Sequence, residues 1–438
     1  MDSIKVAYDG LKKIYKQHFN MTKKRQYLLI CICWLSYTVA QLGRYSYSSN
    51  ITLIMDRFSL EHAVAGIPST LFFFAYGIGQ ICVGFFCNKF NRKILITVAL
   101  SLSGIINLVI FFGADFFTIK YLWLLNGFVQ ANLWPVLLLI LRENLSPERI
   151  SFTSVVMATA STGGKFLAIG VCTIFAIDTN IFMYSFLAAG ILPLSVAVTF
   201  LFATGKIKKP EHKEKQAVQQ KQPKQKADKK AIILLLLLGE FSLVSYAVYG
   251  GLQSWVPSII KENYGLSDSL SIFMSLLLPL FTLSVAVISP YLYKKLKNYV
   301  LISLLCFVIG ALFIAGVLLL LDVSWIPIII LFTMEAVTMS IVSNTTTVQV
   351  PLTFRGKFDA GFLAGFLNGS CYIGTAVATY ALGYIADARG WTGAFILLIC
   401  ITVFSALLAL IYILFNNKEK GNKTIQNDLQ HEQTVNNE

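Results

Sequence analysis

The sequence predicts an all-α, polytopic membrane protein with twelve transmembrane helices in two six-helix halves. Of its 438 residues, 56% are hydrophobic and only 13% are charged, whereas an average soluble domain has about 25% charged residues. Apolar stretches of the roughly 20 residues that span a bilayer recur along the chain. One long polar segment rich in Lys and Gln divides these stretches six and six. A composition with so few charged residues is not typical of a soluble domain and indicates a membrane protein.

The twelve expected spans follow one another with short polar turns between them. Their ends are defined only to within several residues. They cover residues 27–53, 64–86, 94–113, 120–141, 152–178, 181–204, 231–258, 269–292, 299–321, 325–349, 360–384 and 391–415.

The spans divide the chain into five parts. Residues 1–26 precede the first span, and their apolar side chains recur at helical spacing among lysines, which predicts an amphipathic segment on the cytoplasmic membrane surface. Residues 27–204 form the N-terminal half and residues 231–415 the C-terminal half. The Lys- and Gln-rich linker at 205–230 and the polar tail at 416–438 are expected in the cytoplasm.

The formal charge of +14 is explained by topology. If the amino terminus is cytoplasmic, all but six of the 36 Lys and Arg residues fall in cytoplasmic segments, as the positive-inside rule requires. The exceptions are Arg57, Lys120, Lys261 and Arg389 outside, and Arg44 and Lys165 within spans. We therefore expect a multi-pass protein of the plasma or inner membrane with both termini cytoplasmic, in contact with membrane lipid and without a nucleic-acid partner.

Three ionisable residues lie inside predicted spans: Arg44, Lys165 and Glu335. A charge in hydrocarbon costs several kcal/mol unless it faces a polar cavity or a partner, so each is a functional-site candidate. Arg44 offers forked donors for a carboxylate or phosphate. Lys165 could bind substrate or neutralise Glu335. Glu335 could be a proton carrier, a ligand for a cationic group or one member of a charge pair.

Two sets of motifs resemble a known family. The turn after the second span, Gly84 to Lys93, is similar to the signature loop of the major facilitator superfamily, although Asn88 replaces its usual acid. Three further stretches resemble the organophosphate:phosphate antiporters, a family that includes glycerol-phosphate and hexose-phosphate transporters. The three stretches are Gln41-Leu42-Gly43-Arg44, the Gly-x-x-Gln-x-x-x-Trp-Pro pattern at 127–135, and residues 360–395.

The resemblance implies a major facilitator fold and assigns roles to several residues. It makes Arg44 the substrate-binding arginine of the first helix, and Gln130 and Trp134 part of the fourth-helix motif. The family has a second arginine in its seventh helix, near Tyr249 here, and a lysine in its second helix, where this chain has Gln80.

These arguments give one set of candidate site residues. The substrate-binding candidates are Arg44, Lys165, Gln80, Gln130, Trp134, Tyr246 and Tyr249, and Glu335 is the candidate for proton coupling or a charge pair. Gly-rich phosphate loops, paired catalytic carboxylates and metal-spaced histidines are missing from the sequence. We therefore expect no enzyme activity, catalytic residue, metal or cofactor.

The expected function is secondary transport of a small hydrophilic organic anion, phosphorylated or zwitterionic species included, by alternating access. The protein would be a monomeric antiporter or proton-coupled symporter, with a proton or phosphate as coupling ion. Two alternatives stay open at this point: an exporter of drugs or metabolites, and a transporter-like ligand sensor. The residues do not define the substrate, the direction of transport or the coupling ion.

Overall fold

The computed structural model describes residues 22–86, 90–179, 181–204, 229–353, 358 and 360–435. Throughout these ranges the regular structure is helical, with no strand. The prediction of an all-α protein is therefore confirmed. Most of the predicted amphipathic segment and linker, together with residues 87–89 of the signature loop, lie outside the described residues.

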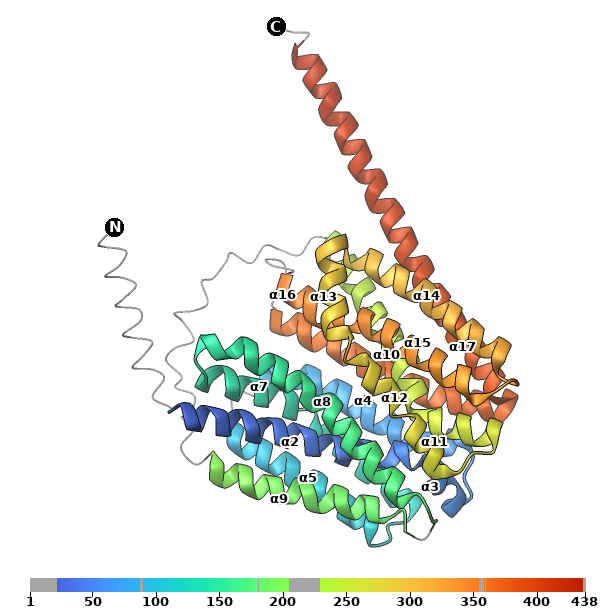
Figure 1. Ribbon diagram of the computed structural model, residues 1–438. Helices are drawn as coiled ribbons and strands as arrows, with labels where there is room; N and C mark the ends of the chain where they lie inside the picture. The colour runs from blue at the N-terminus through green and yellow to red at the C-terminus, as the bar shows by residue number, and fades with distance from the viewer. Residues whose placement is uncertain are drawn as a thin grey trace.

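The N-terminal half is the set of helices that precede the linker (Figure 1). They are α2 (Lys23–Ser49), α3 (Ile51–Phe58), α4 (His62–Phe86), α5 (Arg92–Phe111), α6 (Phe116–Gln130), α7 (Leu133–Asn144), α8 (Pro147–Phe175) and α9 (Tyr184–Ala203). Within this half α2 packs against α8 and α9, and α4 packs against α6.

The C-terminal half follows the linker. Its elements are α10 (Lys229–Tyr264), α11 (Asp268–Met274), α12 (Leu277–Thr282), α13 (Val285–Leu296), α14 (Tyr299–Leu320), α15 (Trp325–Asn344), η2 (Thr345–Gln349), α16 (Val350–Thr353) and α17 (Ala360–Val435). The two halves meet where α4 packs against α17, α8 against α11, and α3 against α10.

Ten helical segments of the described chain are long and apolar enough to cross a membrane. One of them, Phe362–Asn416, contains two spans, because Gly390 has φ 67° and ψ 179° and interrupts the helix. A shorter apolar segment at Thr159–Phe175 belongs to α8. With Phe362–Asn416 counted as two spans and Thr159–Phe175 added, the described chain has twelve spans, which match the twelve predicted stretches.

Local side chains set several helix ends. Asn91 caps α5 by accepting a hydrogen bond from the amide of Lys93 (3.0 Å), and Asp115 caps α6 through the amide of Thr118 (2.6 Å). The Thr118 amide lowers the pKa of the Asp115 carboxyl, because an N–H donor stabilises the charged form. Such capping satisfies amide groups that have no partner within the helix.

The first span ends earlier than predicted. We expected it to reach residue 53, but α2 ends at Ser49 and α3 begins at Ile51. Asn50 lies between them, fully buried, and its side-chain amide donates to the Ser46 carbonyl and to the Ser185 hydroxyl, both at 2.8 Å. These bonds hold the break between the two helices, which hydropathy alone does not reveal.

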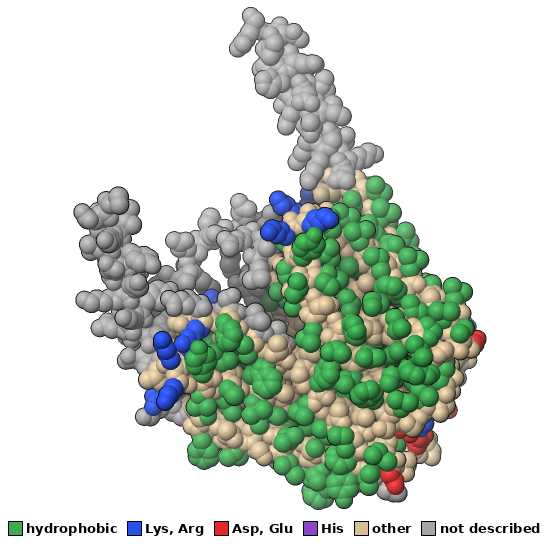
Figure 2. All heavy atoms as spheres, viewed as in Figure 1, with side chains coloured by type: hydrophobic (Ala, Val, Ile, Leu, Met, Phe, Trp, Pro, Cys, Tyr) green, Lys and Arg blue, Asp and Glu red, His purple; other side chains and the backbone are tan. Residues whose placement is uncertain are grey.

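The surface has the charge distribution of a membrane protein. In Figure 2 hydrophobic side chains cover the middle of the visible face, Lys and Arg lie at its left and upper margins, and Asp and Glu lie at its lower right. Large apolar side chains such as Phe112 and Leu319 are about 80% exposed, which suits contact with lipid rather than water. The protein is a multi-pass membrane protein.

Candidate functional site

A cavity of about 460 Å³ lies between the two halves. The N-terminal half contributes its walls from α2, α4 and α8, and the C-terminal half from α10 and α17. The lining residues are Gln41, Arg44, Tyr45, Phe73, Ser161, Lys165, Tyr246, Tyr249, Gly250, Gln253, Ser254, Tyr372 and Thr375. This volume includes space that is open to solvent.

Arg44 enters this cavity from α2. Its guanidinium lies 4.2 Å from the ring centroid of Tyr76 and 6.0 Å from that of Tyr372, and its Nε donates to Gln130 Oε1 at 3.4 Å. The residue is only 3% exposed, and its second terminal nitrogen has no hydrogen-bond partner in the described chain. Aromatic faces attract a cation but leave its forked donors available to an anion.

Gln130 holds Arg44 from behind the cavity wall. Its side-chain amide donates to Ser103 Oγ at 2.8 Å and to Asn126 Oδ1 at 3.1 Å, which leaves its oxygen directed at the arginine. Gln130 is fully buried and does not line the cavity. It orients the guanidinium rather than facing a ligand.

Lys165 enters the cavity from α8, which packs against α2. Its Nζ donates to the hydroxyl of Tyr249 at 2.9 Å and lies 5.4 Å from the ring centroid of Tyr45. Among the described residues no carboxylate forms an ion pair with Lys165 or with Arg44. The cavity therefore contains two cations whose charge the described protein does not neutralise.

Small residues let the helices approach one another around the cavity. A Cβ added at Gly164 on α8 would lie 2.6 Å from the Thr38 carbonyl oxygen of α2, and one added at Gly250 on α10 would lie 2.3 Å from Thr375 Oγ1 of α17. Each close approach lies within one half, and the two glycines are adjacent in sequence to Lys165 and Tyr249.

The predicted site residues fall into two groups. Arg44, Lys165, Tyr246 and Tyr249 line the cavity, whereas Gln80, Trp134 and Glu335 do not. The Gln80 amide donates to the Ala131 carbonyl at 2.6 Å and its oxygen accepts from Asn368 at 3.1 Å. The ring of Trp134 packs 4.6 Å from that of Tyr37.

Glu335 lies apart from both cations. It is 1% exposed on α15, where its Oε2 accepts a long 3.4 Å bond from Thr338 and its Oε1 has no hydrogen-bond partner in the described chain. Gly310 of α14 makes room for it, since a Cβ there would lie 2.8 Å from Oε2. The pairing with Lys165 that the sequence allowed is not formed.

The sequence did not predict the aromatic lining residues, because nothing in their spacing marks them. Phe73, Tyr45 and Tyr372 all face the cavity. Tyr372 lies 4.3 Å from Tyr76 and 5.7 Å from Tyr246, measured between ring centroids, so it joins the aromatic contacts of Arg44 to those of the C-terminal half. Only the adjacency of Tyr45 to Arg44 could have suggested one of these residues.

A model of the Major Facilitator Superfamily matches residues 33–358. The chain belongs to the major facilitator superfamily. Membership of this superfamily supports secondary transport as the general function of the chain.

Similar sequences cover only part of this superfamily member. The membrane sensor protein UhpC of Escherichia coli K12 is 29% identical over 112 residues, which is 26% of this chain and 25% of the sensor. A probable hexose phosphate transport protein of Chlamydia pneumoniae is 25% identical over 197 residues, 44% of this chain and 42% of that protein. The chain thus matches between a quarter and about two fifths of the length of these relatives, which agree with the resemblance to organophosphate antiporters.

Solved structures share the fold over nearly the whole chain. A bacterial homolog of the human lysosomal transporter Spinster, in an inward-facing and unoccupied conformation, has a TM-score of 0.74 at 14% identity and covers 89% of this chain and 97% of its own. The nucleoside transporter NupG has a TM-score of 0.66 at 13% identity, with 88% and 98% covered. At such low identity these similarities establish the superfamily fold alone.

Proposed function

We propose that this protein transports a small organic anion, with phosphorylated compounds as the preferred class, and that Arg44 and Lys165 bind the anionic group. One observation carries the proposal: two cations, the buried Arg44 and the partly buried Lys165, line one cavity, and no described carboxylate neutralises either. Buried charges need a partner. A bound anion supplies it.

The arrangement also supports a phosphorylated ligand. The resemblance to the antiporters implies an arginine pair, and Tyr249 stands near the second arginine of that family. Here the Lys165 ammonium lies 2.9 Å from the Tyr249 hydroxyl. Lys165 therefore supplies a cation from α8 where the resembling family supplies one from its seventh helix. The relative from Chlamydia pneumoniae is named as a probable hexose phosphate transport protein, which agrees with this class.

A counterflow assay tests the proposal. Purified protein in liposomes preloaded with a hexose phosphate should take up the labelled compound and should not take up the uncharged hexose. Lys165→Gln should lower this exchange by roughly tenfold or more, the effect expected from losing a charge-assisted hydrogen bond. Lys294→Gln is the matched control, because Lys294 is exposed at the end of α13 and lies outside the cavity. Equal exchange of hexose and hexose phosphate would refute the proposal.

The coupling ion is either phosphate, in exchange, or a proton. Glu335 supports a proton, because a buried carboxyl with no cationic partner in the described chain is most stable in its neutral form. We assign Glu335 to proton coupling and not to substrate binding, since it does not line the cavity. Counterflow with internal phosphate, compared with uptake driven by an imposed pH gradient, distinguishes the two modes.

A ligand sensor is the second candidate, favoured by the similarity to a protein named as a membrane sensor. A sensor would bind hexose phosphate through the same two cations but would show no counterflow. An exporter of amphipathic drugs is disfavoured, because such compounds would leave the two cavity cations without an anion. We also propose that both termini are cytoplasmic, on the strength of the Lys and Arg distribution.

A further inference from the structure

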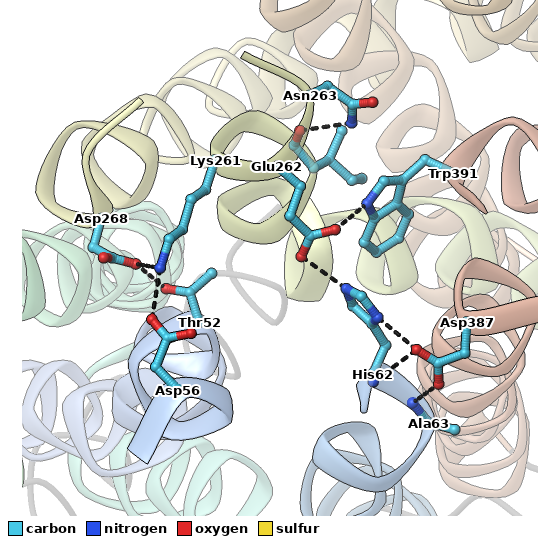
Figure 3. Close-up of polar contacts among 11 residues, drawn as sticks. Thr52, Asp56, His62, Ala63, Lys261, Glu262, Asn263, Asp268, Asp387 and Trp391 are labelled. Atoms are coloured by element: carbon cyan, nitrogen blue, oxygen red, sulfur yellow. Dashed lines mark hydrogen bonds and ion pairs between the residues drawn. The ribbon is translucent and has the colours of Figure 1, made fainter. Parts of the chain in front are cut away.

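A second group of charges lies at the far end of the helices from the amino ends of α2 and α10. We call it the outer gate, because this end is extracellular in the proposed topology. It consists of Asp56, His62, Lys261, Glu262, Asp268 and Asp387 (Figure 3). None of these residues lines the anion cavity.

The first part of the outer gate centres on Lys261 of α10. Its Nζ lies 2.7 Å from Asp56 Oδ2 of α3 and 3.0 Å from Asp268 Oδ1 of α11. Thr52 of α3 also donates to Asp268 at 2.5 Å. These contacts join the N-terminal half to the C-terminal half.

The second part centres on His62, the first residue of α4. Its Nε2 lies 2.7 Å from Glu262 Oε1 of α10, and its Nδ1 lies 2.6 Å from Asp387 Oδ1 of α17. The amides of His62 and Ala63 also donate to Asp387, at 2.9 and 2.7 Å. Trp391 Nε1 donates to the other oxygen of Glu262 at 2.8 Å, as Figure 3 shows.

The helices meet closely at this point. A Cβ added at Gly383 of α17 would lie 2.9 Å from the His62 carbonyl oxygen. The rings of Trp255 and Trp391 lie 5.5 and 5.2 Å from the imidazole ring, measured between centroids. The His62 side chain is still 17% exposed, and that of Glu262 is 37% exposed, so water and protons reach the group.

Both ring nitrogens of His62 face carboxylate oxygens, and this arrangement needs a proton. An ionised carboxylate only accepts hydrogen bonds, and a neutral imidazole donates from one nitrogen only. A neutral ring would direct a lone pair at one of the two carboxylates at under 3 Å. The closed arrangement is therefore satisfied only when the group of three holds one additional proton, on the ring or shared with a carboxyl.

We propose that His62, Glu262 and Asp387 form a proton-binding site, and that the bound proton holds the outer gate closed. Opening the gate would separate α4 from α10 and α17, and His62 would lose both acceptors. The closed state thus binds the proton more tightly than the open state does. Stabilisation of the closed state is complete below the pH at which the open-state histidine titrates, about 6.5, and is lost as pH rises.

No other charged side chain in the described chain forms a hydrogen bond or ion pair with His62. Lys261 is adjacent in sequence to Glu262 but is bound by Asp56 and Asp268. Glu61 and Arg389 have no hydrogen bond or ion pair with His62 among the described residues. The proposal rests on alternating access, but not on the identity of the transported anion. The site regulates the opening of the outer gate only.

Distance measurement between spin labels tests the proposal without any substrate. Labels at Phe112→Cys and Val323→Cys, both exposed residues in turns at the outer ends of the two halves, report the width of the outer gate in a background without the eight native cysteines. In full-length protein in lipid nanodiscs, the ratio of open to closed populations should rise roughly tenfold or more between about pH 5.5 and about pH 8, since one released proton changes the ratio by up to about tenfold per pH unit.

Two variants give opposite results. His62→Gln leaves one carboxylate facing an amide oxygen, so the gate should open more at every pH and lose its pH dependence. Glu262→Gln should keep the gate closed at both pH values, because its amide can donate to Nε2 of a neutral ring while its oxygen accepts from Trp391. Size-exclusion chromatography checks that each variant is folded, and either variant alone suffices for the test.

Lys261→Gln is the matched control. It breaks the other part of the outer gate, so it should raise the open population while leaving the pH dependence in place. A pH-independent distance distribution in the wild type would overturn the proposal. So would an unchanged pH response in a folded His62→Gln or Glu262→Gln variant.

Discussion

Lys165 of α8 donates a hydrogen bond of 2.9 Å to the hydroxyl of Tyr249 of α10. The bond crosses from the N-terminal half to the C-terminal half inside the cavity that also contains Arg44. It holds a cation at the junction of the two halves, which would move against each other in the proposed alternating access. Both cations belong to the N-terminal half, so a ligand that binds them would contact the C-terminal half through the cavity residues of α10 and α17.

Tyr249→Phe tests whether this bond positions the Lys165 ammonium. Loss of one hydrogen bond costs about 1 kcal/mol, so we expect the KM for hexose phosphate counterflow to rise roughly fivefold. Tyr380→Phe is the control, because Tyr380 is 43% exposed on the surface of α17. An unchanged KM in Tyr249→Phe would mean that the bond does not position the cation.

Glu335→Gln tests the assignment of proton coupling. Glutamine keeps the shape of the side chain and cannot exchange a proton, so uptake driven by a pH gradient should be abolished while counterflow continues. Exchange needs no net protonation cycle. If both activities fell together, Glu335 would have a role in substrate binding or in folding, and unchanged pH-driven uptake would remove it from coupling altogether.

Topology is tested by cysteine labelling with an impermeant reagent in intact cells. Lys294→Cys lies at the end of α13, which we place in the cytoplasm, and Val323→Cys lies in the turn between α14 and α15 on the outer side. Only Val323→Cys should be labelled, because 30 of the 36 basic residues are cytoplasmic in this arrangement. Labelling of Lys294→Cys alone would show that the topology is the reverse of the proposed one. The outer gate would then lie on the cytoplasmic side.

Hydropathy predicted the helices well because each span must satisfy its own backbone in lipid. It misplaced the end of the first span, where the buried bonds of Asn50 decide the break. The intramembrane charge of Arg44 and Lys165 marked two cavity residues correctly. Their partners could not be predicted, since the contact with Tyr249 joins residues 84 positions apart.

The candidates Gln80 and Trp134 show the same limit of prediction from sequence. Gln80 and Trp134 are suited to line a cavity, yet Gln80 bonds to Ala131 and Asn368, and Trp134 packs on Tyr37. A span contains polar residues for contacts between helices as well as for ligands. The residue type does not reveal which role applies, and neither does the position along one helix. The outer gate was not predicted either, because its charges come from five separate helices.

The central claim is that Arg44 binds the anionic group of the transported compound. The most direct test is the affinity of purified Arg44→Lys for hexose phosphate, measured by calorimetry against Arg142→Lys, whose side chain is exposed at the end of α7. An ammonium keeps the charge but loses the forked donors, so we expect binding to weaken roughly 10- to 100-fold in Arg44→Lys only. Wild-type affinity in a folded Arg44→Lys variant would contradict the account.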